Sequence, residues 1–156
     1  MAEEIENFKK AGADGFVFGV LNEEGRVDRK SCDTLMRAAE GRGCTFHRAF
    51  DEILEEYMQE ELEVLIDLGF ENVLTSGGAK TAMEGREVLK RLVQSARGRI
   101  QIIVGGGVRS GNVNTLREIV GMWFHSSAIV DVGDIACKKE VKELVELLKA
   151  EIVNTK

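Results

Sequence analysis

Short apolar runs with β-strand composition alternate along this chain with segments whose apolar residues recur at helical spacing. Five strands are predicted, over residues 15–21, 44–50, 72–75, 100–104 and 122–125. The clearest helix covers residues 28–42, where Cys32, Leu35, Met36 and Ala39 fall on one face. Right-handed crossovers join strands that alternate with helices of this length, so the sequence predicts a parallel sheet with flanking helices.

The composition indicates one folded domain over residues 1–156, because no linker or compositional shift divides the chain. An apolar fraction of 44% and a charged fraction of 31% are typical of a globular protein. The net charge of -6 argues against nucleic acid as a partner. No apolar run is long enough to span a membrane, and the amino terminus lacks the layout of a signal peptide. We therefore expect a cytoplasmic protein.

Polar and small residues follow four of the predicted strands, at the carboxyl edge where parallel sheets bind ligands. A guanidinium or imidazole there can hold a carboxylate or phosphate, and glycine-rich turns offer backbone N–H groups to an anion. The candidate anion site comprises His47, Arg48, Ser76, Gly77, Gly105, Gly106, Gly107, His125 and Ser126. The alternative is that the glycines serve only tight turns. Asp51 is placed either within this group or as the N-cap of the next helix.

Five stretches of the sequence resemble the CutC copper-homeostasis family. They are GADGFVFGVLNEEGRVD, TFHRAFD, LGFENVLTSGGAKTAMEG, GGGV and FHSSA, between about residue 8 and residue 128. TFHRAFD is highly specific to that family. The resemblance implies an eight-stranded βα barrel and a role in copper homeostasis, with Cu(I) binding proposed and enzymatic activity unproven. The matching stretches resemble strands four to eight of that barrel, and the family's first three strands and early cysteines have no counterpart here.

A metal site is the second interpretation of the two histidines, His47 and His125, which are the only ones in the chain. Both follow strands, so both are expected on one face of the molecule. Cu(I) accepts two or three soft ligands, and Cys44 is the nearest thiol in the sequence. The metal candidates are therefore Cys44, His47 and His125, although alternation along the strand points Cys44 to the other face. The widely spaced cysteines, which include Cys32 and Cys137, are expected to be free thiols.

The predicted alternation of strands and helices is compatible with two folds, an open sheet and a barrel. Five strands cannot close an eight-stranded barrel. We therefore favour an open, flavodoxin-like five-stranded sheet with helices on both faces, in which the strand 15–21 lies inside the sheet. A helix within residues 1–12 would then cover the face that lines a barrel. The alternative is a partial barrel of the CutC type completed by oligomerisation. The open sheet predicts a monomer or weak homodimer.

The predicted function is copper homeostasis by a CutC-like protein, in a truncated or engineered form without catalysis. One alternative is a barrel-derived enzyme or binding module for a phosphorylated small metabolite. Another is a product of fold evolution or engineering with no activity. Binding of Cu(I) would favour the first of these functions, and binding of phosphate would favour the second.

Overall fold

The computed structural model describes residues 1–120, 123–131 and 133–150. Met122, the first residue of the fifth predicted strand, lies outside this part of the chain. The helices and strands, in chain order, are α1 (Ala2–Lys10), β1 (Gly15–Phe18), α2 (Arg29–Ala39), β2 (Gly43–Phe46), α3 (Met58–Asp67), β3 (Asn72–Thr75), α4 (Arg86–Ala96), β4 (Gln101–Val104), α5 (Val113–Val120) and α6 (Lys138–Lys149). Two 3₁₀ helices, η1 (Arg48–Glu52) and η2 (Glu55–Tyr57), lie between β2 and α3.

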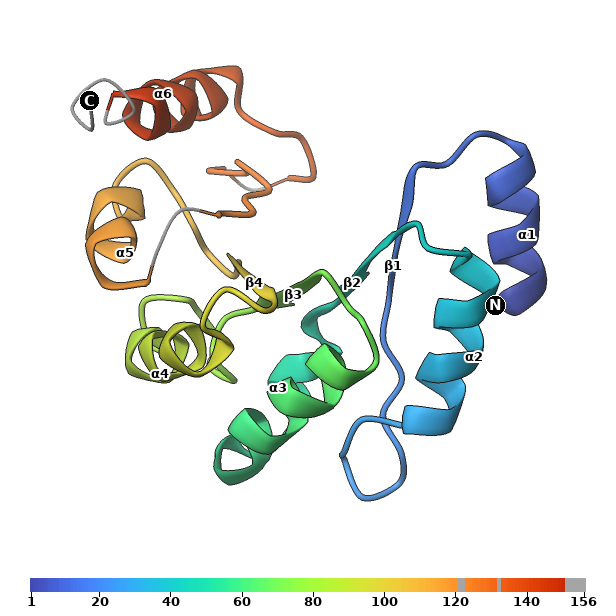
Figure 1. Cartoon of the computed structure of the whole chain (residues 1–156). Coiled ribbons are helices and arrows are strands. Elements are labelled where there is room, and N and C mark those ends of the chain that lie inside the picture. Colours follow the sequence, from blue (N-terminus) through green and yellow to red (C-terminus); the bar gives the residue numbers. More distant parts are fainter. Residues whose placement is uncertain (121–122, 132, 151–156) are drawn as a thin grey trace.

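The four strands form a parallel sheet whose spatial order follows the chain, β1-β2-β3-β4. A right-handed crossover that always steps to the next strand on the same side places every crossover helix on the same face of the sheet. Figure 1 shows this arrangement, with the helices following one another around the outside and the strands on the inside. Neighbouring helices pack together, α1 on α2, α3 on α4, α4 on α5 and α5 on α6.

This order differs from the flavodoxin-like sheet that we favoured. In that fold the strand order reverses once, which sends helices to both faces. Here β1 lies at the edge of the sheet instead of inside it. The predicted amino-terminal helix does not cover the inner face either, because α1 packs against α2 on the outside, where Lys9 Nζ donates to the Ala38 carbonyl at 3.0 Å. The alternative, an incomplete βα barrel, matches these findings.

The fifth predicted strand continues the sheet beyond β4 as a single parallel bridge, between Val104 and Phe124. The Val104 N–H donates to the Trp123 carbonyl, and the His125 N–H donates to the Val104 carbonyl, each at 2.8 Å. Because side chains alternate along a strand, Trp123 and His125 lie on the face opposite to Val104. The segment therefore brings His125 to the carboxyl end of β4.

The core lies between the sheet and the helices. Phe46 is fully buried at its centre, with its ring centroid 5.5 Å from that of Phe70 and 6.4 Å from that of Phe50. Val73 and Val104 extend the same buried face to β3 and β4. The opposite face carries no helix in the described ranges, and Val17 there is 65% exposed. Among the described residues, no helix combines the length and apolar character that a membrane span needs.

Helix α2 begins with an aspartate cap. The Asp28 carboxylate accepts hydrogen bonds from the Ser31 N–H at 2.9 Å and from Ser31 Oγ at 2.7 Å. These bonds, the backbone one first, hold the pKa of Asp28 below its ordinary value of 3.8. A carboxyl group with a depressed pKa in the folded state stabilises the protein above its unfolded pKa and loses this contribution as the pH falls through the folded pKa.

We predict that Asp28→Ala lowers the urea midpoint of unfolding at pH 7, because the first turn of α2 loses its cap. The difference from the parent protein should narrow as the pH is lowered from 5 to about 2, where the parent carboxyl is also protonated. Asp28→Asn, which keeps an accepting oxygen without the charge, is the matched control and should lose less at pH 7. A difference that stays constant with pH would contradict the charge-assisted cap.

Candidate functional site

A buried carboxylate ties together the loops at the carboxyl ends of β2 and β3. Asp51, in η1, has a side chain only 7% exposed. It accepts hydrogen bonds from Thr75 Oγ1 at 2.5 Å, from the Ser76 N–H at 2.9 Å and from the Gly78 N–H at 3.0 Å. Asp51 therefore does not cap the following helix α3. This contradicts one of our two interpretations of that residue.

Arg48 joins this carboxylate on its exposed side. Its Nε donates to Asp51 Oδ2 at 2.7 Å, and its Nη2 donates to Ser76 Oγ at 2.8 Å. Ser76 Oγ in turn donates to the Ala79 carbonyl at 2.5 Å. The guanidinium is thus fixed at two nitrogens, while the Arg48 side chain stays 43% exposed. A fixed, partly exposed guanidinium can bind a carboxylate or phosphate with little loss of side-chain entropy.

The first glycine-rich turn already holds an anion, which is the chain's own carboxylate. Gly77 and Gly78 have φ values of 76° and 74°, a region that favours glycine. The Gly78 N–H donates to Asp51, and the Gly77 N–H donates to Thr75 Oγ1 at 2.8 Å. The Ser76 and Gly78 N–H groups of this turn therefore donate to Asp51, a carboxylate of the chain itself, whereas the Gly77 N–H does not.

The second glycine-rich turn follows β4 and leaves its N–H groups available. Gly106 has a φ of 94°, and a Cβ placed on it would lie 3.0 Å from Ser76 Cβ and 3.5 Å from Arg48 Cζ. Gly107 also has a positive φ, of 71°. Within the part of the chain that the structure describes, neither the Gly106 nor the Gly107 N–H donates to another group. The turn therefore brings unpaired amide donors next to the Arg48 guanidinium.

The two histidines have different surroundings. The ring nitrogen Nδ1 of His47 accepts a hydrogen bond from the Ala49 N–H at 3.2 Å, so in the neutral ring the proton lies on Nε2. His125 is exposed, and a Cβ placed on Gly105 would lie 3.7 Å from its Cβ. The structure thus groups Arg48, Ser76 and Gly106, with His125 at the neighbouring Gly105.

Ser126 belongs to a separate cluster. Its Oγ donates to the Val108 carbonyl at 2.6 Å and accepts from the Ala128 N–H at 3.0 Å. Arg109 also donates to Ser126 Oγ, at 3.2 Å, and its Nη2 donates to the Ile129 carbonyl at 2.7 Å. Ser126 therefore holds the chain segment after the fifth strand, and its hydroxyl is not directed to the Arg48 group by any of these contacts.

The predicted metal candidates do not converge. Cys44 is buried on the helix-covered face of β2, where its thiol donates to the Arg42 carbonyl at 3.3 Å. Burial, and secondly the negative charge of Glu71, raises the pKa of this thiol, which disfavours the thiolate that binds metals. His47 comes directly after the same strand, and the alternation of side chains places it on the opposite face. Across residues 1–120, 123–131 and 133–150, no three His, Cys, Asp or Glu side chains form a group that could hold a metal ion.

The central role of Asp51 was not predicted from the sequence, and Thr75 was predicted only as the last residue of a strand, not as a site residue. A local signal exists for both, since Asp51 closes TFHRAFD and Thr75 precedes Ser76 and the glycines. Their contact joins residues 24 positions apart, however, so spacing alone could not pair them. Asp51 itself was placed either with Arg48 at the carboxyl edge or as the N-cap of the next helix.

We predict that Asp51→Ala lowers the free energy of unfolding by about 3 kcal/mol, because buried hydroxyl and N–H donors lose their acceptor and Arg48 loses its counter-charge. Urea denaturation measures this change. The neighbouring exposed Glu52→Ala is the control and should cost less than about 0.5 kcal/mol. Equal effects of the two substitutions would show that the Asp51 network does not stabilise the fold.

Comparison with known proteins identifies relatives. The sequence profile of the CutC family matches residues 1–130. A CutC family protein of Histophilus somni is 51% identical over 119 residues, which are 76% of this chain and 48% of that protein. The human copper homeostasis protein cutC homolog is 34% identical over an alignment 169 residues long, which covers 99% of this chain and 61% of that protein. The chain spans about half the length of most of the curated relatives it matches.

Solved structures agree with this assignment. The crystal structure of CutC from Streptococcus agalactiae superposes with a TM-score of 0.76 at 29% identity, covering 80% of this chain and 60% of that one. An aldolase, QR15, superposes with a TM-score of 0.69 at 17% identity, over 94% of this chain and 67% of its own, and at that identity the likeness concerns the fold alone. On the family match and these relatives, the chain belongs to the CutC family.

Proposed function

We propose that this CutC-family chain binds a small anion, a phosphorylated or carboxylated metabolite, at the carboxyl edge of its sheet. The observation that carries the proposal is the proximity of the Gly106 turn, whose N–H groups are unpaired among the described residues, to the fixed guanidinium of Arg48, which a Cβ on Gly106 would approach to 3.5 Å. In βα barrels, loops at this edge commonly hold phosphate through backbone N–H groups. No catalytic step is part of the proposal.

The basis for proposing a role in copper homeostasis is the names of the relatives, among them the human and Caenorhabditis elegans proteins. We retain that role as the cellular context of the proposed anion site. The residues predicted as copper ligands do not fit a copper site, because the Cys44 thiol lies on the helix-covered face and has a raised pKa. His47 Nδ1 accepts an N–H, so coordination through Nε2 would require a doubly deprotonated ring or the loss of that bond.

We predict that inorganic phosphate, titrated calorimetrically, binds the parent protein and that Arg48→Gln weakens its Kd by tenfold or more, as expected for the loss of a charged hydrogen-bond donor. The matched control is Arg91→Gln, which removes a guanidinium of similar exposure on α4. Circular dichroism checks that each variant is folded. Phosphate binding that is equal in the parent protein and Arg48→Gln would contradict the proposed site.

We predict that Cu(I), titrated anaerobically with a competing chelator, forms no 1:1 complex that depends on Cys44. Cys44→Ala should therefore leave any affinity for Cu(I) unchanged. His125→Gln, which replaces the exposed histidine of the predicted site, is measured in the same way. A 1:1 complex that both substitutions abolish in folded protein would overturn this interpretation and restore the three-residue copper site.

A further inference from the structure

The positive charge of Arg48 is largely neutralised within the protein. Its Nε donates to Asp51 Oδ2 at 2.7 Å, and the Asp51 side chain is only 7% exposed. Two opposite charges this close together act on an approaching ion mainly as a dipole, because their fields nearly cancel at longer range. Arg48 Nη1 has no hydrogen-bond partner among the described residues, so the guanidinium can still donate to an anion. It therefore contributes a directed hydrogen bond more than net charge.

A second cation, Lys80, lies in the loop between β3 and α4, which packs against the Gly106 turn. The Ala82 N–H donates to the Gly106 carbonyl at 2.8 Å. A Cβ placed on Gly107 would lie 3.5 Å from Thr81 Cγ2. The backbone on the carboxyl side of Lys80 is therefore fixed beside the turn whose N–H groups are unpaired among the described residues.

The charge of Lys80 is not neutralised by a partner. Lys80 is exposed, and its ammonium makes no hydrogen bond or ion pair within the described ranges. The carboxylate of the same loop, that of Glu84, accepts the Thr81 N–H at 3.0 Å instead. Arg109 is the cation of the loop after β4, and two of its nitrogens donate to the Ile129 carbonyl. Of these two cations, Lys80 is therefore the one that can turn to an external anion.

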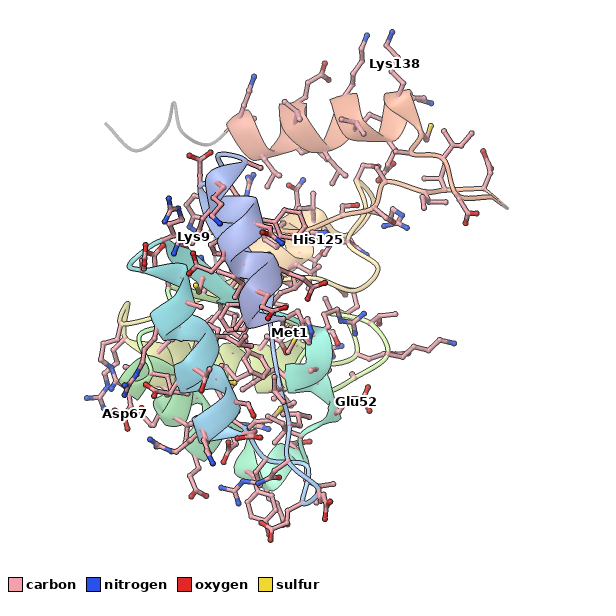
Figure 2. The ribbon with its side chains drawn as sticks, turned by 90° about the vertical axis from the view of Figure 1, so that its right-hand side faces the viewer. Met1, Lys9, Glu52, Asp67, His125 and Lys138 are labelled. Carbon is pink, nitrogen blue, oxygen red and sulfur yellow. The ribbon has the colours of Figure 1, made fainter. Side chains whose placement is uncertain are left out.

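The loops that carry these groups follow three neighbouring strands of the sheet. In Figure 2 the labelled residues Glu52 and His125 lie to the right of α1, and they mark the carboxyl ends of β2 and β4. The strand between them is β3, whose loop carries Lys80. An anion at the Gly106 turn would thus have Arg48 beside it and the long, flexible side chain of Lys80 on the adjoining loop.

We propose that Lys80 supplies the net positive charge of the anion site and makes the site select a phosphate monoester over a carboxylate. This inference rests on the anion site proposed above. A phosphate monoester carries about −1.5 to −2 charges at pH 7 and offers three acceptor oxygens, enough for Lys80, Arg48 and the N–H groups of the turn together. A carboxylate carries a single charge on two oxygens, so it gains less from a second cation. The ligand class is therefore a phosphorylated small metabolite.

The test compares phenyl phosphate with benzoate, which share an aromatic ring and differ in the anionic group. In calorimetric titrations at pH 8, phenyl phosphate should bind the parent protein about tenfold more tightly than benzoate. Lys80→Gln should weaken the Kd of phenyl phosphate by about fivefold and that of benzoate by less than about twofold, as expected for the loss of one exposed charged contact. Lys80→Arg, which keeps the charge, should restore most of the affinity for phenyl phosphate.

The matched control is Lys90→Gln, which removes the same charge from an exposed lysine of α4 that has no ion pair among the described residues. It should leave both Kd values unchanged, and circular dichroism verifies that every variant is folded. Equal effects of Lys80→Gln and Lys90→Gln, or an equal weakening of both ligands by Lys80→Gln, would overturn the role of Lys80. Phosphate binding that still depends on Arg48 would then leave the anion site standing. A folded parent protein that does not bind phenyl phosphate would overturn both.

Discussion

The Asp51 carboxylate is the interaction on which the carboxyl edge of the sheet depends. It lies in η1, directly after β2, and receives the Ser76 and Gly78 N–H groups from the loop after β3. The same carboxylate orients Arg48, and Arg48 and Ser76 together abut Gly106 after β4. Three consecutive strand ends are thus fixed through one buried charge. A charge so deeply placed is tolerable because hydroxyl, amide and guanidinium donors surround it.

This arrangement separates two glycine-rich turns that look alike in the sequence. In the turn after β3 the Gly78 N–H donates to the internal carboxylate and the Gly77 N–H donates to Thr75 Oγ1, so these glycines serve the fold. The turn after β4 makes no such use of Gly106 and Gly107 among the described residues, so its donors are the ones an external anion would meet. At the proposed anion site, the Asp51 carboxylate would repel a second negative charge, and the Arg48 guanidinium, which donates to that carboxylate, would offset this repulsion.

Local periodicity predicted the elements better than their arrangement. Three of the four strands fall within predicted runs, and β2 begins one residue before its run, at Gly43. Helix α2 falls within the predicted helix 28–42, because burial of one face produces a periodic pattern of apolar residues. The predicted strand 44–50 was too long, since His47 accepts the Ala49 N–H and starts η1. Strand order was wrong because a crossover has the same sequence pattern whichever neighbour it reaches. Asp51 was missed as the centre of the site because its partners Thr75 and Ser76 come from another βα unit.

The two faces of the sheet in an incomplete barrel differ in composition. The side chains of the inner face limit what can cover it. The outer face is sealed by helices over Phe46 and Val73, which are fully buried. The inner face alternates a polar row, Thr45, Asn72 and Gln101, with an apolar one that includes Ile103. Asn72 Nδ2 donates to Thr45 Oγ1 at 3.2 Å within the polar row. A purely apolar cover would leave the remaining polar groups of the row without hydrogen bonds, at a cost of roughly 1–3 kcal/mol for each buried group. The polar row therefore disfavours a purely apolar cover of the inner face.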